Sequence, residues 1–280
     1  MEIFLFIKTE DTFQWLAPYG YLIVSLGFVF FFFRVFENWY ANSKNRPLYR
    51  QFFVYRTLNK EQVLLLEQDF SFYNDLSTKH RKQFQHRVVT FISEKKFIGR
   101  QKLEVSGTMK LLIAATACML SFGRKNYKYD LIDYILVYPD EFYSAANKTN
   151  HKGEFNPREK ALVLSWKDFE KGYQITNDNF NLGIHEFMHA MQLEARQSRD
   201  VDSIRFQKQF QNILKQLTNQ ELKDTLDKTR YFRKYAFTNQ YEFMAVLAEY
   251  FIESPAEFKT HFPKLYEYTK KLLNFTFAGY

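Results

Sequence analysis

Residues 184–190 read Ile-His-Glu-Phe-Met-His-Ala, and this stretch is the strongest indication of the fold. His185 and His189 are one helical turn apart, so their imidazoles project from the same helix face toward one ion. Zinc held by two imidazoles polarises a water molecule, and the adjacent Glu186 is placed to take a proton from that water. A pair of hydrogen-bonded core histidines is the alternative. The spacing predicts a buried helix that carries a metal site.

A catalytic zinc site needs a third protein ligand, and a later helix offers two carboxylates for this position. Asn239 is a suitable N-cap, Glu242 falls on the first turn, and Glu249 lies seven residues on, on nearly the same face. One of the two should bind zinc, and the other could orient a ligand histidine from behind. A surface position fits either glutamate poorly, because the flanking residues are apolar. Four other histidines are assigned no role: His80, His86, His151 and His261.

Two short runs are typical of strands. Residues 131–138 (Leu-Ile-Asp-Tyr-Ile-Leu-Val-Tyr) and 161–166 (Ala-Leu-Val-Leu-Ser-Trp) are rich in β-branched, leucine and aromatic residues and are bounded by turn-forming residues. Elsewhere the apolar spacing is helical. The sequence therefore predicts an α+β domain that is mostly helical, with a small sheet.

The expected helices lie on both sides of these runs. Residues 58–98 have apolar positions at three- and four-residue steps, which predicts two amphipathic helices. Residues 108–120 are nearly all apolar but too short to span a membrane, so we expect a central buried helix capped by Ser106. Helices continue from Asn181, including one polar helix and a loop within residues 197–228. The later helices should break at two prolines, Pro255 and Pro263.

Several short motifs, in order along residues 60–275, resemble the Mlc titration factor A family of zinc peptidases. That family is itself similar to the catalytic domain of anthrax lethal factor. The motifs are the segment 185–189, the run Leu162, Val163, Leu164, Ser165 and Trp166, the group Val137, Tyr138, Pro139 and Phe142, and the segments 242–246 and 249–251. The resemblance implies a zincin-like metallopeptidase domain.

The resemblance also implies roles for individual residues. In that family two histidines and a later glutamate bind one zinc ion per chain, which corresponds here to His185, His189 and Glu242. The glutamate within the histidine motif is the general base and corresponds to Glu186. A tyrosine seven residues before the third ligand stabilises the oxyanion, and Tyr235 holds that position. Histidine and carboxylate ligands would also accept cobalt or manganese.

The expected reaction is peptide-bond hydrolysis of the gluzincin type, with a metal-activated water, a general base and an oxyanion donor. We expect the run from Leu162 to Trp166 to be a sheet edge that aligns an extended peptide by strand addition. The resembled family shows aminopeptidase activity on small substrates, so short peptides are the expected substrates. The sequence itself leaves exopeptidase and endopeptidase action open.

An apolar segment near the N-terminus predicts a transmembrane helix. Residues 12–33 contain no charged side chain, and as a helix they would span about 33 Å. Aromatic residues lie toward both ends, as at the two interfaces of a bilayer: Trp15, Tyr19, Tyr21, Trp39 and Tyr40. A buried core helix is the soluble alternative, but the segment has no polar stripe to face water. A cleaved signal peptide fits worse, because acidic residues precede the run and no cleavage site follows it.

Basic residues follow this segment and give the expected orientation. They are Arg34, Lys44, Arg46, Arg50 and Arg56, opposed only by Glu37. The positive-inside rule places this side in the cytoplasm, where anionic headgroups would attract it. We expect a single-pass protein of the cell inner membrane. Residues 1–40 would hold the transmembrane helix, residues 41–58 a basic linker, and residues 59–280 the cytoplasmic peptidase domain.

The composition and charge of the chain limit the classes of partner that it is expected to bind. The 280 residues are 46% hydrophobic and 25% charged, which excludes a disordered or polytopic membrane chain. The net charge of +8 could favour nucleic acid, but the sequence has no zinc-finger spacing and no glycine-rich phosphate loop. No nucleic-acid partner is therefore expected. The expected partners are a peptide substrate and, through the N-terminal helix, the lipid bilayer.

Two other classes of function stay open. The main alternative is a non-catalytic zinc-containing module that sequesters a regulatory protein, such as a transcriptional repressor, at the membrane. The other is an adaptor for lipid or nucleic acid, which would associate with its partner in a salt-sensitive way.

Overall fold

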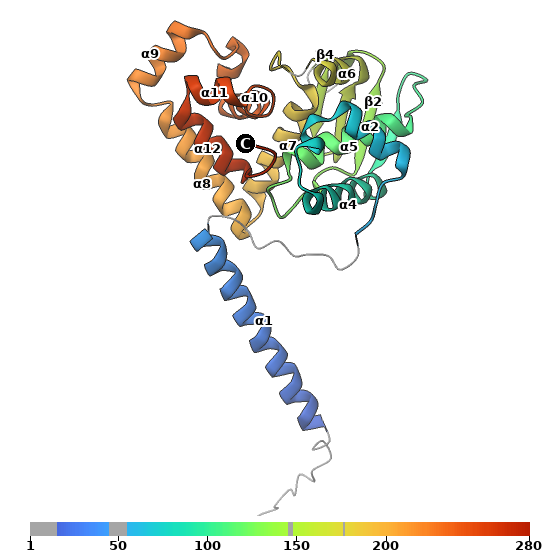
Figure 1. Cartoon of the computed structure of the whole chain (residues 1–280), viewed down its shortest axis with the longest axis vertical. Helices are drawn as coiled ribbons and strands as arrows, with labels where there is room; N and C mark the ends of the chain where they lie inside the picture. Colours follow the sequence, from blue (N-terminus) through green and yellow to red (C-terminus); the bar gives the residue numbers. More distant parts are fainter. Residues whose placement is uncertain (1–15, 45–54, 145–147, 176) are drawn as a thin grey trace, which may run out of the picture. The chain divides into compact units, whose positions relative to one another are not determined.

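The computed structural model describes residues 16–44, 55–144, 148–175 and 177–280 (Figure 1). The chain divides into two compact units, Met1–Leu48 and Tyr49–Tyr280. The first contains one described helix, α1 (Ala17–Lys44), and the second contains every other described helix and strand.

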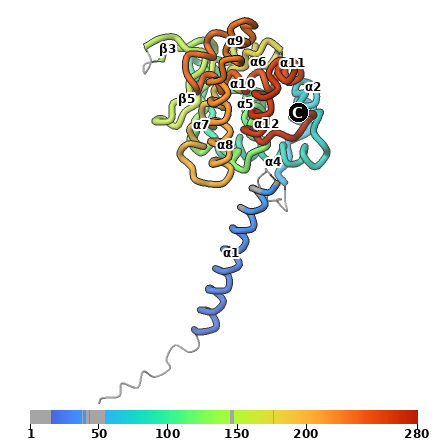
Figure 2. Tube along the Cα trace, turned by 90° about the vertical axis from the view of Figure 1, so that its left-hand side faces the viewer, coloured from blue at the N-terminus to red at the C-terminus, as the bar shows by residue number. Residues whose placement is uncertain are grey.

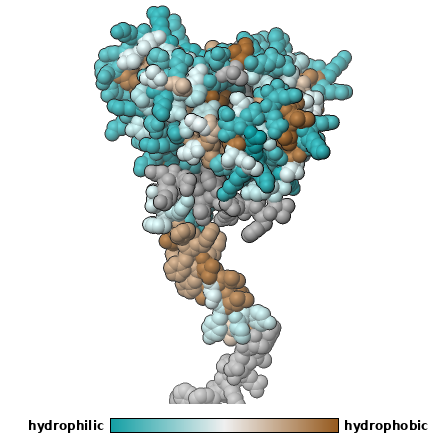
Figure 3. All heavy atoms as spheres, in the orientation of Figure 1, coloured by the Kyte–Doolittle hydropathy of each residue, from teal (hydrophilic) through white to brown (hydrophobic). Residues whose placement is uncertain are grey.

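The helix α1 carries no charged residue from Ala17 to Phe33. Its stretch Ala17–Glu37 is 21 residues long and apolar enough to cross a membrane, and none of the apolar window is buried by other parts of the chain. Figure 3 shows apolar side chains over much of its surface, whereas the visible face of the second unit is mostly hydrophilic. The predicted long apolar helix is confirmed from Ala17 onward as a candidate membrane span, and residues 12–15 of the predicted segment lie outside the described residues.

A four-stranded sheet forms one part of the second unit, in the order β1-β2-β6-β5. Its strands are β1 (Lys96–Gly99), β2 (Tyr134–Tyr138), β5 (Gly153–Asn156) and β6 (Ala161–Ser165). The strands β1, β2 and β6 are parallel to one another, and β5 pairs with β6 in the antiparallel direction at one edge of the sheet. A separate antiparallel pair joins β3 (Phe142–Ser144) and β4 (Thr149–His151). The two predicted strands are therefore present, and four shorter ones accompany them.

The prediction that the run from Leu162 to Trp166 is a sheet edge is wrong. Leu162, Val163, Leu164 and Ser165 belong to β6, which pairs with β2 on one side and β5 on the other. Trp166 is the first residue of the helix α6 (Trp166–Gln174). Every residue of β6 is buried, and a continuous apolar run of this kind is typical of an interior strand. The edge of the sheet on this side is β5.

Four helices of the second unit come before β2 in the described chain. They are α2 (Lys60–Asp69), α3 (Ser71–Asn74), α4 (Thr78–Glu94) and α5 (Gly107–Leu120). Two helices were predicted within residues 58–98, but the structure has three in this range, followed by β1. The central helix α5 is buried from Leu111 to Leu120, and the Ser106 hydroxyl caps it by accepting from Met109 N, as predicted.

The helix α7 (Leu182–Gln197) carries the histidine motif, and the C-terminal helices follow it. They are α8 (Val201–Gln216), α9 (Gln220–Thr229), the short 3₁₀ helix η2 (Lys234–Phe237), α10 (Gln240–Glu253), α11 (Pro255–His261) and α12 (Pro263–Leu273). Pro255 and Pro263 each stand at the first position of a helix, where proline loses no hydrogen bond. The polar run 197–228 contains two helices rather than one, because Asn219 caps a second one.

These elements place α7 at the centre of the second unit. Figures 1 and 2 show α7 beside α5 and the sheet, with the C-terminal helices along its other side. It packs on α5, α8, α10 and β5. Most of the buried hydrophobic residues form one cluster that runs from Leu58 to Phe275. A mostly helical fold with a small sheet is confirmed.

Candidate metal centre

The first turn of α7 sets the direction of its two histidines. Asn181 is the N-cap, and its side-chain oxygen accepts from Ile184 N at 3.0 Å. The helix is buried over most of its length among apolar neighbours, with Ile184 and Phe187 fully covered. His185 and His189 therefore keep one orientation, toward α10, and their ring centroids lie 4.7 Å apart.

The first turn of α10 brings a carboxylate to the same point. Asn239 caps this helix, and its side-chain oxygen accepts from Tyr241 N at 2.8 Å and from Glu242 N at 3.1 Å. Most of the rest of α10 is apolar, with Glu249 and Glu253 as exceptions, and it packs along α7. Burial of that apolar face fixes Glu242 in front of the histidines.

Three potential ligand atoms converge between the two helices. His185 Nε2 lies 3.1 Å from His189 Nε2 and 2.9 Å from Glu242 Oε2, and His189 Nε2 lies 3.4 Å from the same oxygen. Ligands of a tetrahedral zinc ion are about 3.4 Å apart, given metal–ligand distances near 2.1 Å. These residues also form the one group of three possible metal ligands found among the described residues. The spacing fits a zinc-sized ion.

The chemistry of the three groups also fits a cation. Burial disfavours the charged form of His185, but hydrogen bonds with Glu242 and Glu249 outweigh this effect and raise its pKa to about 10. Burial likewise opposes the charged form of Glu242, yet the two histidines hold its pKa well below the usual range. A positive charge is therefore favoured at this point. A divalent cation can supply it in place of the proton.

Glu249 lies behind the first histidine. The Nδ1–H of His185 donates to Glu249 Oε1 at 2.7 Å. When a metal replaces the second proton of the ring, the lone pair of Nε2 would therefore face Glu242 and His189. The carboxylate of Glu249 is fully buried and also accepts from Asn181 N at 3.0 Å. The structure thus brings Glu242, and not Glu249, to the side where the ligand atoms converge.

Arg233 completes the surroundings of this buried carboxylate. Its Nη1 and Nη2 donate to Glu249 Oε2 and Oε1 at 2.9 and 2.6 Å, in a bidentate pair. Nη1 also donates to the carbonyl of Asn179, and the guanidinium lies 4.4 Å from the centre of the Phe180 ring. Arg233 therefore ties the loop before α7 to the residue that orients His185.

Glu186 is buried next to the histidines and close to the edge strand. Burial raises the pKa of its carboxyl group, although the two neighbouring histidines lower it. A Cβ atom at Gly153, the first residue of β5, would lie 2.6 Å from Glu186 Oε1 and 2.7 Å from Leu182 Cδ1. Any larger residue here would force Glu186 and Leu182 to shift, so β5 approaches the carboxylate directly.

Tyr235 lies in η2, near His185. Its ring centroid is 5.9 Å from that of His185, and the side chain is about half exposed. Burial and the nearby carboxylate of Glu242 raise the pKa of the phenol, so it stays protonated and can donate a hydrogen bond.

Comparison with known proteins identifies the family. A family model described as glucose-regulated metallo-peptidase M90 matches residues 41–273. The chain belongs to this family. It is 30% identical over 238 residues to the uncharacterized protein slr2042 of Synechocystis sp. (strain ATCC 27184 / PCC 6803 / Kazusa), covering 77% of this chain and 84% of that protein. It is 23% identical over 211 residues to Mlc titration factor A of Klebsiella pneumoniae (strain 342), covering 69% of this chain and 78% of that protein. The resemblance inferred from the motifs is confirmed.

Four of the predicted site residues of this M90 chain line one cleft of about 720 Å³: His185, Glu186, Tyr235 and Glu249. Its walls come from α7, the loop before it, η2, and the region of β4 and β5. The residues that line it include His151, Lys152, Gly153, Phe180, His185, Glu186 and Tyr235. His151 was assigned no role from the sequence, yet it lies in this wall. The cleft is large enough for a few residues of an extended peptide.

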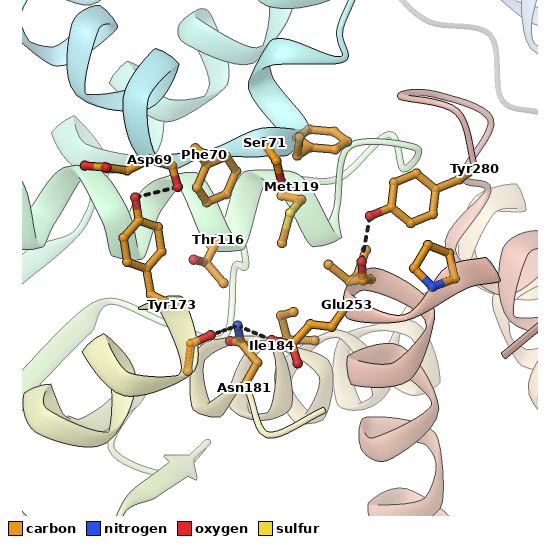
Figure 4. Close-up of a pocket in the computed structure, with 14 residues that line it drawn as sticks. Asp69, Phe70, Ser71, Thr116, Met119, Tyr173, Asn181, Ile184, Glu253 and Tyr280 are labelled. Atoms are coloured by element: carbon orange, nitrogen blue, oxygen red, sulfur yellow. Dashed lines mark hydrogen bonds between the residues drawn. The ribbon is translucent and has the colours of Figure 1, made fainter. Parts of the chain in front are cut away.

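A smaller cavity of about 250 Å³ lies on another side of α7 (Figure 4). Asn181, Ile184 and Glu253 line one side, and Phe70 and Met119 line the other. The Asn181 side-chain amide donates to Glu253 Oε1 at 3.0 Å. Burial raises the pKa of Glu253 to about 7, although this hydrogen bond lowers it. Asn181 therefore connects the cavity to Glu249 and the metal centre.

Sequence reasoning missed three residues of the site. An asparagine before an apolar helix is a recognisable N-cap signal, so Asn181 could have been singled out. Arg233 and Gly153 have no local pattern of their own. Their importance comes from contacts with Glu249 and Glu186, which lie far away in the sequence.

Proposed function

We propose that this chain is a zinc metallopeptidase of the gluzincin type with a zincin-like fold. The observation that supports it best is the convergence of His185, His189 and Glu242 at separations suited to a tetrahedral zinc ion. The M90 family is described as a metallo-peptidase family, which agrees with this site. One zinc ion per chain would be held by these three side chains, and Glu249 would orient His185 from behind.

The chain's own residues would perform the proton chemistry. When bound, zinc would polarise a water molecule and lower its pKa toward neutrality. Glu186 is the general base, since its carboxylate is next to both histidines and faces the cleft where a substrate would lie. Its raised pKa makes it a better proton acceptor at neutral pH. Tyr235 donates to the oxyanion, because its phenol stays protonated at the edge of the same cleft.

The substrate in this proposal is a short peptide, bound in an extended form. The strand β5 would align it, because the outer side of β5 is unpaired among the described residues and Gly153 borders Glu186. An extended peptide can add to such an edge through main-chain hydrogen bonds. Aminopeptidase-like action follows from the family resemblance.

The proposal places the enzyme at a membrane. The stretch Ala17–Glu37 would cross the bilayer of the cell inner membrane once, with residues 59–280 in the cytoplasm. Basic residues after the span support this orientation, with Lys44 and Arg56 among them.

A binding function is the second candidate, and one observation favours it. Four exposed aromatic side chains, each about half exposed or more, belong to segments that surround the cleft: Tyr143, Phe180, Tyr235 and Phe237. Exposed aromatic residues of this kind are frequent at protein interfaces. A relative of this chain is named Mlc titration factor A. If binding is the function, the chain would bind a regulatory protein and would not hydrolyse peptides.

The change Glu186→Gln separates the two functions. If the peptidase proposal holds, the full-length variant keeps its zinc but hydrolyses a library of short peptides about 10²- to 10⁴-fold more slowly than the parent. Glu194→Gln is the matched control, because Glu194 lies on the same helix and accepts from Leu131 N, outside the cleft. No hydrolysis by the zinc-loaded parent would favour the binding function.

A further inference from the structure

A second polar pocket lies outside the metal centre, between α4 and the loop that follows α5. Its volume is about 530 Å³. It is lined by Arg56, His86, Arg87, Thr90, Ser93, Glu94, Lys125, Asn126, Tyr127 and Lys128. Four of these residues are cations and one is a carboxylate. The pocket shares none of its lining residues with the cleft at the metal centre.

Hydrogen bonds hold the start of the described second unit against this pocket. Arg56 N donates to His86 Nδ1 at 3.0 Å, and Arg56 Nη1 donates to Ser93 Oγ at 2.9 Å. The ring of Tyr55 packs edge-on to that of His86 at 5.9 Å. The guanidinium of Arg56 therefore has a defined place on the wall.

The lining of the pocket carries a net positive charge. Burial lowers the pKa of His86, and the charges of Arg56, Arg87 and Lys128 lower it further. His86 therefore stays neutral and accepts the Arg56 N–H, while the surrounding cations disfavour any additional proton. The same cations would attract an anion that entered the pocket and would stabilise it there.

The cations differ in what they offer to a ligand. Arg87 is buried and donates to the carbonyls of Ser121, Phe122 and Arg124 at the end of α5, so it supplies charge rather than a direct contact. Lys128 pairs with Glu94. The side chains of Arg56 and Lys125 are exposed and are the ones best placed to bind an oxyanion.

The position of Arg56 in the sequence indicates which anion this would be. Arg56 follows Lys44, the last residue of α1, by twelve residues, and a chain of that length spans at most about 40 Å. A bilayer crossed by α1 would therefore present lipid phosphates at high local concentration. Arg46 and Arg50 in the intervening segment would be attracted to the same surface.

We propose that this pocket binds the phosphate group of an anionic phospholipid headgroup and so docks the peptidase unit on the bilayer that α1 enters. The inference rests on the proposed membrane anchoring. It adds a second attachment, made by the folded unit itself.

The test uses the full chain in lipid nanodiscs, made of phosphatidylcholine alone or with one third phosphatidylglycerol. Hydrogen–deuterium exchange is followed in peptides that cover residues 84–94 and 121–130. We expect slower exchange in both segments in the anionic discs only. The double variant Arg56→Gln/Lys125→Gln should lose this protection, since each basic residue near an anionic surface strengthens binding about fivefold and removing two weakens it about 25-fold. The matched control Lys223→Gln/Lys228→Gln removes the same charge from α9 and should keep the protection.

Three other results would overturn the inference for different reasons. Equal protection in the parent and the Arg56/Lys125 double variant would mean that general attraction of the linker brings the unit to the membrane. The same protection from millimolar inorganic phosphate in phosphatidylcholine discs would mean that a soluble phosphate is the ligand. Loss of the whole chain from the discs in alkaline carbonate would instead contradict the membrane anchoring itself.

Discussion

The Nδ1 atom of His185 lies 2.7 Å from Oε1 of Glu249, on the side of the imidazole that faces away from His189 and Glu242. This hydrogen bond fixes the tautomer in which Nε2 is free to bind a metal. Glu249→Gln should therefore weaken zinc binding about 10- to 100-fold without removing any ligand. Competition with a chelator measures the affinity. Glu257→Gln, on α11, is the control and should leave the affinity unchanged. Unchanged zinc affinity in Glu249→Gln would show that this contact does not orient the histidine.

Arg233 is expected to stabilise the fold as well as the site. Its bidentate pair with Glu249 is nearly buried, with side-chain exposures of 16% and 1%. Arg233→Met leaves the carboxylate without its cation, so the free energy of unfolding should fall by about 3 kcal/mol or more. Denaturant titration of the metal-free protein measures this. Adding Glu249→Leu to Arg233→Met should recover part of the loss, because the buried charge is then gone. If the losses of unfolding free energy in the two single variants add up in the double variant, the two side chains do not stabilise each other.

Gly153→Ala tests how closely the edge strand approaches the proposed base. The new methyl group would lie 2.6 Å from Glu186 Oε1, so the carboxylate must move. We expect kcat to fall about 10- to 100-fold while zinc content is unchanged. Gly107→Ala is the control, since a Cβ atom there meets nothing within 4 Å. Equal activity of both variants would mean that Glu186 is not held in place by β5.

Glu253 should make stability fall as pH rises. Its pKa is raised from 4.5 to about 7 in the folded protein, so between these values the folded state binds the proton and the unfolded state does not. Stability from this group is fully present below about pH 4.5 and is lost as pH rises through 7, by up to about 3 kcal/mol. Unfolding measurements across this range on the parent and on Glu253→Gln isolate the effect, because other groups cancel in the difference. The same pH slope in both proteins would contradict it.

Much of the site could be predicted because its signals are local. The spacing of His185 and His189 follows from the helical repeat, and the pairing of Asn239 with Glu242 follows from capping chemistry. The choice between Glu242 and Glu249 was open from spacing alone, since both lie on one face of α10. It depends on how α10 is placed against α7, which only the packed structure shows.

The sheet was harder to predict for a physical reason. The run in β6 is apolar at nearly every position, which is typical of a strand but does not indicate its neighbours. Whether it lies at an edge depends on β5, a four-residue strand whose residues are all half-buried and show no alternation. Arg233 was missed for a similar reason, because its role depends on a contact sixteen residues away.

Metal content tests the central claim most directly. The full chain, saturated with zinc and freed of excess metal, is measured by elemental mass spectrometry together with Glu242→Ala and Glu249→Gln. The account predicts one zinc ion per chain in the parent, almost none in Glu242→Ala, and nearly one in Glu249→Gln. No bound metal in the parent after zinc is supplied, or zinc kept in Glu242→Ala but lost in Glu249→Gln, would contradict the three-ligand site on which the proposed peptidase rests.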